Sequence, residues 1–367
     1  MRHIKFSFFH AILYAATLLL AGCSVLPPPA LTPVGEHPLP SAAPEGLSGI
    51  ARLRSDSYAL AEDSGGRIHF AKILINKTTG AITNCTFTDV MTIPGLVDAE
   101  GIAYNKYRGK NGTLYVADEN GPKIVQIPLG SQRKVDKALD DVFFIWSGGA
   151  VAEKPLPLPE FLRNVRPNKA LEALSAERPS FSNSPPQFGL DLWTANEDAL
   201  TIDGAPSSAT NAPLVRICRI PDDWWYYRLD AAQGGPIPGA GPDVPFNGLV
   251  GLAALGEGRL LVLERSCGFV QGVDGGPPSL ITSSIYYVDT SRTKPGSPTP
   301  LRKTLLWRQS FPFSNYEGIT LGPKLADGSR AVILVADGDV STARVGGMTL
   351  TMQWKKALFA LRLKEPR

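Results

Sequence analysis

A short phrase recurs five times between residues 46 and 340, and each time it opens the same longer pattern. Its clearest copies read AEGIA, LEALS and YEGIT. An apolar strand begins with the phrase, a turn or loop follows, and a second apolar strand ends on acidic residues. Repeats a few tens of residues long are typical of solenoids, propellers and arrays. The equivalent positions in the five units are Ser48, Glu100, Glu172, Val250 and Glu317.

Each unit continues with further strand candidates, which gives about four strands per unit separated by Gly- and Pro-rich turns. The segments lack the 3.6-residue period of helical repeats. Second strands such as VILVA are apolar at successive positions, as expected when both faces of a sheet are covered. We therefore expect an all-β fold, a closed β-propeller of four-stranded antiparallel blades. Five repeats are visible, so the ring has five or six blades: a sixth may hide in the longer gaps, or the two chain ends share one.

Residues 1–22 have the features of a secretory signal: Arg2 and Lys5 precede an apolar run that ends in LAGC at Cys23. This ending resembles the lipobox of bacterial lipoproteins. The resemblance implies cleavage before Cys23, lipidation of its thiol and anchoring to a membrane through the lipid. Ser24 then implies the outer membrane, with the protein facing the periplasm or the exterior. The alternative is an ordinary secreted protein with a cysteine at this place.

Residues 23–45 are rich in proline and show no apolar period, which predicts an extended tether that carries the lipid. The propeller domain then covers residues 46–367, ample for one large core. The net charge is only +3 and no basic block occurs, so nucleic acid is not expected as a partner. The oligomeric state stays open.

The remaining cysteines, Cys85, Cys218 and Cys267, lack the spacing of a zinc or iron–sulfur site. If a disulfide exists, Cys218 and Cys267 are the favoured pair. His69 lies in a predicted strand, where a packed or solvent-facing role is favoured over a catalytic one. The aromatic run from Trp224 to Tyr227 is expected in the packed outer part of a blade rather than on an exposed binding platform.

Strand geometry places the acidic residues of the different repeats at one end of the propeller. Because the first two strands of a unit are antiparallel, the start of the first and the end of the second lie at one end of the blade. If the first strand lines the channel, one mouth carries a ring of carboxylates suited to a hard cation such as Ca²⁺. The candidate metal ligands are the strand-end acids Asp118, Glu119, Glu197, Glu264 and Asp337.

The glutamates that open the first strands have a different expected role. A structural device recurs in every blade, whereas a catalytic site usually does not, which favours a structural role for Glu100, Glu172 and Glu317. Lys123, Lys169 and Arg265 are cations near these acids and are candidates for binding phosphate oxygens. Catalytic residues are not identifiable from the sequence, which contains neither a G-x-S-x-G elbow nor a Walker motif.

Three phrases, RPNKALEALSAE, GLVGLAALGEGRLLVLER and SNYEGITLGPKLADGS, resemble the phytase-like family described as "esterase-like activity of phytase". The resemblance covers nearly all of residues 46–363. It implies a β-propeller and hydrolysis of phosphoric esters, with a phosphorylated small molecule as substrate. The DDPAIW-like phrase associated with true β-propeller phytases is absent. Two functions therefore stand: a metal-dependent phosphoesterase, or a non-catalytic propeller that binds a ligand or protein partner at the cell envelope.

Overall fold

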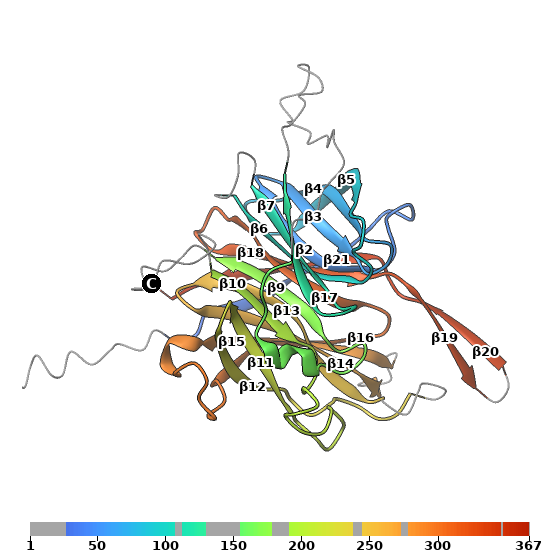
Figure 1. The fold of residues 1–367 in the computed structure, drawn as a ribbon. Coiled ribbons are helices and arrows are strands. Elements are labelled where there is room, and N and C mark those ends of the chain that lie inside the picture. The colour runs from blue at the N-terminus through green and yellow to red at the C-terminus, as the bar shows by residue number, and fades with distance from the viewer. Residues whose placement is uncertain are drawn as a thin grey trace, which may run out of the picture.

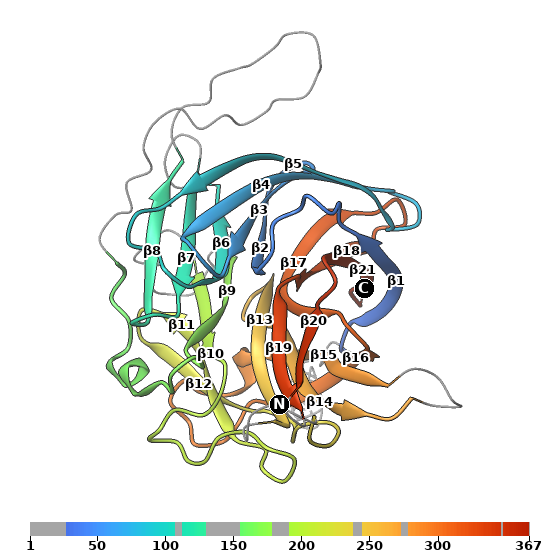
Figure 2. The same ribbon diagram turned by 90° about the vertical axis from the view of Figure 1, so that its right-hand side faces the viewer.

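The computed structural model describes residues 27–106, 112–129, 155–177, 191–237, 244–272, 278–345 and 348–366. Over these residues it shows five antiparallel sheets arranged around one axis, the blades of a β-propeller (Figure 1; Figure 2). Each inner strand contacts the inner strands of both neighbouring blades, so the ring closes at five blades. In ring order, the inner strands are β2 (Leu47–Arg54), β6 (Ala99–Asn105), β9 (Leu171–Glu177), β13 (Phe246–Gly256) and β17 (Asn315–Lys324).

Blades 1 to 4 follow one another along the chain, and each runs outward from its inner strand. Blade 1 continues from β2 with β3 (Ser57–Glu62), β4 (Arg67–Ile75) and β5 (Ile82–Thr92). Blade 2 continues from β6 with β7 (Thr113–Asp118) and β8 (Lys123–Pro128). Blade 3 continues from β9 with β10 (Asp191–Asn196), β11 (Leu214–Ile220) and β12 (Asp223–Arg228). Blade 4 continues from β13 with β14 (Arg259–Val270), β15 (Ser279–Asp289) and β16 (Lys303–Phe311). Short 3₁₀ helices are η1 (Glu160–Asn164) and η3 (Thr290–Arg292).

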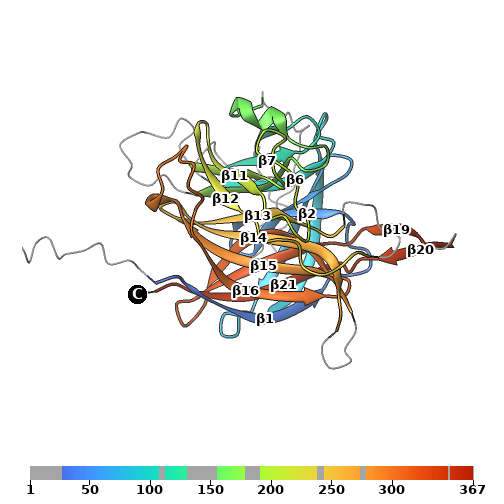
Figure 3. The ribbon, with the colours of Figure 1, turned by 90° about the horizontal axis from the view of Figure 1, so that it is seen from below.

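Blade 5 closes the ring with strands from both ends of the chain. From the axis outward, β17 is followed by β18 (Arg330–Asp337), β21 (Ala357–Lys364) and β1 (Ala30–Pro38). The shared closing blade was one of the two possibilities left open by the sequence. A hairpin of β19 (Val340–Val345) and β20 (Met348–Gln353) interrupts this blade and projects away from the ring (Figure 1; Figure 3).

The expected tether over residues 23–45 is therefore wrong for Ala30–Pro38, which pair with β21 from Ala30↔Lys364 to Pro38↔Ala357. Proline composition suggested a tether because proline cannot donate a ladder hydrogen bond. That loss is tolerated on an edge strand, and β1 is the outer edge of its blade. The register also shifts between Pro33 and Gly35, at a β-bulge that absorbs the irregular backbone.

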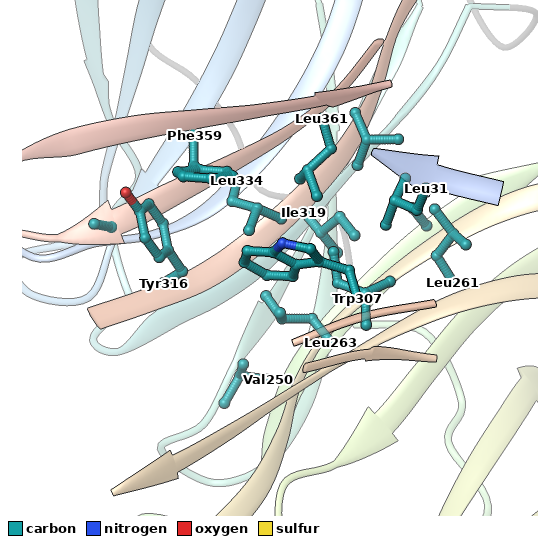
Figure 4. Packing of buried hydrophobic residues seen from close by; sticks show 14 of the residues in the cluster. Leu31, Val250, Leu261, Leu263, Trp307, Tyr316, Ile319, Leu334, Phe359 and Leu361 are labelled. Carbon is teal, nitrogen blue, oxygen red and sulfur yellow. The ribbon is translucent and has the colours of Figure 1, made fainter. Parts of the chain in front are cut away.

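The blades are held together by apolar clusters, one between each pair of neighbours. Figure 4 shows the cluster between blades 4 and 5, where the indole of Trp307 lies among side chains of both blades. Its ring centroid is 5.4 Å from that of Phe359, and Leu263 and Leu334 are fully buried beside it. Because each fully buried side chain of this size contributes about 1.5–3 kcal/mol, these interfaces supply most of the stability. They also explain the continuous apolar runs in the second strands.

Small residues in the recurring phrase allow the inner strands to approach closely. A Cβ built on Gly49 would lie 2.2 Å from the carbonyl oxygen of Glu100, and one on Gly318 would lie 2.7 Å from that of Ser48. The residue that follows each of these glycines, Ile50 or Ile319, is aliphatic and buried. These side chains and their counterparts in the other blades fill the axis of the propeller. Only about 10 Å³ remains there, so the channel does not connect the two ends of the propeller for a ligand.

Cys85, Cys218 and Cys267 are free thiols, so the favoured disulfide between Cys218 and Cys267 is not formed. Cys218 packs into the cluster between blades 2 and 3, whereas Cys267 lies on β14 of blade 4. Trp224–Tyr227 form most of β12, the outermost strand of blade 3, as expected. Cys23 and the predicted signal of residues 1–22 lie outside the described residues. Among the described residues, no helix has the length and apolar character needed to cross a membrane.

Candidate functional site: the acidic mouth

Strand register brings the acids of different repeats to one end of the propeller. The first part of each inner strand lies opposite the later part of the second strand of its blade, for example Ala99↔Asp118, Leu249↔Glu264 and Asn315↔Asp337. The antiparallel argument from the sequence is therefore correct. We call this end, where the inner strands begin, the acidic mouth.

Five carboxylates at the acidic mouth form two groups that share one member. In the first group, one oxygen each from Asp98, Glu100 and Glu119 lies within 4.8 Å of the other two. In the second group, the same holds for Glu119, Glu172 and Glu197. Glu119 thus links blade 2 to blade 3. Hard cations such as Ca²⁺ and Mg²⁺ are bound by carboxylate oxygens gathered in this way.

Two cations enter the cluster and bind the most buried of its acids. Lys169 Nζ lies 2.6 Å from Glu197 Oε2, and Arg265 Nη2 lies 2.8 Å from Glu197 Oε1. Arg265 also forms an ion pair with Glu317, joining blades 3, 4 and 5. Lys169 stands over the ring of Phe246, 4.2 Å from its centroid. Two of the three candidate phosphate ligands therefore lie in the cluster and already have carboxylate partners.

Burial and mutual repulsion change the protonation of these acids. Burial raises the pKa of Glu119 to about 7 and that of Glu317 to about 8, with neighbouring carboxylates adding to each rise. Burial, followed by the charges of neighbouring glutamates, also raises the pKa values of Glu100 and Glu172 well above the ordinary range. Burial opposes the charge of Glu197 too, but Lys169 and Arg265 outweigh it and lower its pKa. The cluster thus holds one charged glutamate among others that keep protons near neutral pH.

Further aspartates surround the cluster on the side of blades 1 and 5. Burial and the charges of Asp337 and Asp339 raise the pKa of Asp63 to about 6. Asp337 accepts hydrogen bonds from Asn315 Nδ2 at 3.3 Å and from the backbone N–H of Asp339 at 2.9 Å. Asp337, a candidate metal ligand, therefore lies at the edge of the acidic mouth rather than in either group of three.

Asp118, another candidate ligand, serves the fold of blade 2 instead. Its carboxylate accepts hydrogen bonds from the backbone N–H groups of Val97 at 3.1 Å, Asp98 at 3.3 Å and Asn120 at 3.0 Å. Lys123 Nζ also lies 2.9 Å from Asp118 Oδ2. A fully buried carboxylate with this many donors has its oxygens occupied, and Lys123 is its counterion rather than a member of the cluster.

Glu264 is likewise occupied, at the contact between blades 3 and 4. It accepts hydrogen bonds from Tyr227 Oη at 2.5 Å, Asn247 Nδ2 at 2.6 Å and the backbone N–H of Asp230 at 3.0 Å. Lys303 Nζ lies 2.6 Å from it. Asp118 and Glu264 thus have the structural role that was expected of the glutamates at the strand starts.

The sequence argument missed Asp98 and assigned Glu100 and Glu172 to structure. Asp98 lies one residue before AEGIA and so outside the repeated phrase. The pairing of Ala99 with Asp118 brings it to the acidic mouth. Glu119 combines both roles, because its Oε1 accepts the backbone N–H of Ala170 in the next unit at 2.5 Å. His69 is half-buried, with Nε2 2.5 Å from Glu62 Oε2, and has a packing role as expected.

Comparisons with known proteins give a family but no near relative. No curated protein matches the sequence. Among solved structures, the PQQ-bound aldose sugar dehydrogenase of Streptomyces coelicolor is 12% identical, with a TM-score of 0.40, over 93% of this chain and 100% of that chain. A streptogramin B lyase is 13% identical, with a TM-score of 0.33, over 92% of this chain and 98% of the lyase chain. The model of the family described as phytase-like, esterase-like activity of phytase, matches residues 43–340, and the chain belongs to this family.

Proposed function

We propose that the protein is an exported, lipid-anchored hydrolase of phosphoric esters that depends on a divalent cation, with its site at the acidic mouth. The observation that carries the proposal is the second carboxylate group, Glu119, Glu172 and Glu197, whose oxygens lie within 4.8 Å of one another. Family membership supports hydrolysis of a phosphorylated small molecule. Lipidation of Cys23, attachment to the outer membrane and exposure to the periplasm or exterior are part of the same proposal.

The residues present fit a hard cation. Their donor atoms are carboxylate oxygens, the type that Ca²⁺ selects, and softer thiolate or imidazole donors are absent from both described groups. Burial raises the pKa values of Glu119 and Glu172, and the charges of neighbouring glutamates add repulsion to each rise. A bound cation would relieve this repulsion. When bound, it supplies Lewis-acid activation of water and charge stabilisation on the phosphoryl group.

The protein's own residues would hold the cation and bind the phosphate group. Glu119, Glu172 and Glu197 would hold the cation through their carboxylate oxygens. Lys169, whose side chain is 22% exposed, is the cation best able to reach a phosphate oxygen. Arg265 is more deeply placed and holds Glu197 and Glu317 in position.

One observation favours the second function, a non-catalytic binding propeller. The glutamates of the acidic mouth are each at most 9% exposed: Glu100, Glu119, Glu172, Glu197 and Glu317. The charge of Glu197 is already balanced by two cations. A buried, partly compensated cluster is also what a purely structural core of the ring requires.

Hydrolysis of p-nitrophenyl phosphate and bis(p-nitrophenyl) phosphate, with Ca²⁺ or with a chelator, separates the two functions. We expect Ca²⁺-dependent release of p-nitrophenol, and a loss of about 10- to 100-fold or more in Glu119→Gln, because this variant removes a carboxylate that holds the cation. Glu160→Gln, at an exposed glutamate on η1, is the matched control and should be unchanged. Ca²⁺ binding with no hydrolysis of either ester would contradict the phosphoesterase and leave the binding propeller.

A further inference from the structure

A second cavity lies at the end of the propeller opposite the acidic mouth. All five inner strands line it with residues from their middle or later parts, and its volume is about 560 Å³. We call this cavity the basic funnel, for the charges described below. Its size falls in the range of pockets that hold small organic molecules. Because the axis between the two ends is filled, a ligand here has no contact with the carboxylate cluster.

The wall of the basic funnel presents both polar and apolar surface. It includes half-buried side chains at its rim, among them Tyr104, Leu255 and Leu321, and the buried aliphatic residues of the axis at its floor. Apolar surface that water must cover in the free protein favours a ligand with an apolar body.

The charged groups of the basic funnel are predominantly positive. Arg52, Lys106 and Arg330 line it, and Glu177 is the one carboxyl among the described lining residues. Burial raises the pKa of Glu177 to about 7, so it carries little negative charge below neutral pH. The funnel therefore has the opposite charge from the acidic mouth at the other end of the same ring.

The two arginines lie on neighbouring blades and lack a carboxylate partner among the described residues. Arg52 donates to the carbonyl oxygens of Ser55 at 2.9 Å and Gly322 at 3.3 Å, which fixes its side chain without neutralising it. Gly322 packs against Ala331, the neighbour of Arg330 in β18. The Arg330 side chain forms no hydrogen bond or ion pair with the described residues, although it is only partly exposed. Both guanidinium groups line the same cavity, where each can donate hydrogen bonds to an anion.

We propose that the basic funnel is a second binding site, for a small organic anion whose apolar body lies on the channel floor and whose anionic group is held by Arg52 and Arg330. The site is separate from the proposed phosphoesterase centre and does not depend on it. Sulfonate, phosphate and carboxylate groups share the required chemistry, because each presents oxygens that guanidinium groups bind through charge-assisted hydrogen bonds.

The test uses two fluorescent probes of similar apolar shape, one with and one without the anionic group. We expect 8-anilino-1-naphthalenesulfonate to bind with a stoichiometry of one per chain, more tightly than uncharged N-phenyl-1-naphthylamine. Arg330→Gln should weaken the sulfonate by about tenfold or more, since hydrogen bonds to charged groups contribute about 1.5–3 kcal/mol. The same variant should leave the uncharged probe unchanged. Arg330 has no structural partner among the described residues, so this variant should fold normally.

Lys324→Gln is the control, because Lys324 pairs with Arg330 in the β17–β18 ladder but does not line the funnel. It removes the same charge from the same end of the molecule and should leave both probes unaffected. Glu119→Gln should also leave sulfonate binding intact, which separates this proposal from the function of the acidic mouth. Equal weakening by Arg330→Gln and Lys324→Gln, unchanged binding in Arg330→Gln, or binding at several sites per chain would each overturn the proposal.

Discussion

The carboxylate cluster should make the propeller less stable as the pH rises from acidic to mildly alkaline. Burial and neighbouring charges raise the pKa of Glu119 to about 7, compared with 4.5 for an unperturbed glutamate. Between these values the folded state binds a proton that the unfolded state has released. The stability from this group is therefore fully present below pH 4.5 and is lost as the pH rises through 7.

The size of the effect follows from the shift. At 1.36 kcal/mol for each pKa unit, Glu119 alone accounts for a loss of about 3 kcal/mol in the free energy of unfolding between pH 4.5 and 8. Glu317, with a pKa of about 8, adds a loss of the same sign that begins near pH 4.5 and continues to pH 8. Glu197, with a lowered pKa, acts in the opposite direction but only below pH 4.5.

Urea unfolding followed by tryptophan fluorescence, at pH 5, 6.5 and 8 with a chelator present, measures this dependence. Glu119→Gln should remove about 2.5 kcal/mol of the difference between pH 5 and 8 relative to the wild-type protein. Ca²⁺ should restore stability at pH 8 by about 2.7 kcal/mol at a hundredfold excess over its Kd. An identical pH dependence in wild type and Glu119→Gln would refute the argument that Glu119 is protonated in the folded state.

Three further outcomes are expected. Gly101→Val should destabilise the ring by about 1–3 kcal/mol or more in urea unfolding, because its Cβ would lie 2.7 Å from that of Leu174; Gly235→Ala, with its nearest neighbour 4.0 Å away, should be tolerated. Arg265→Met should cost about 3–5 kcal/mol by leaving two buried glutamates without their shared cation, and an unchanged urea midpoint would argue against the ion pairs. Cys23→Ser should abolish labelling by a radioactive fatty acid, whereas retained labelling would contradict lipidation at this residue.

The fold was predictable because its causes are local and repeated. Apolar runs such as the one in β18 must be covered on both faces, and the small residue after each strand-opening position reflects the close contact of inner strands. The strand β1 was not predictable from composition, because its prolines are acceptable only at an outer edge whose partner, β21, lies at the far end of the chain.

The candidate site was predictable in place but not in detail. Register alone brings the acids to one mouth, but which carboxylates remain available depends on donors from other parts of the chain. Asp118 is occupied by backbone N–H groups of its own blade, and Glu264 by Tyr227 and Lys303 from neighbouring segments. Glu172 has no comparable set of donors among the described residues, and it meets Glu119 only because blades 2 and 3 are adjacent.

The position of β21 has a consequence for the order in which the chain can fold. It lies between β1 and β18, so the last strand to be synthesised completes two ladders at once, one of them with the first strand of the domain. Until then β1 has no partner, and the outer edge of β18 is exposed to other chains. Pairing across nearly the whole sequence carries a large loop-closure cost before its contacts form, which makes this step slow compared with folding of blades 1 to 4. A nascent chain stalled before Ala357 would therefore contain four assembled blades and an open ring.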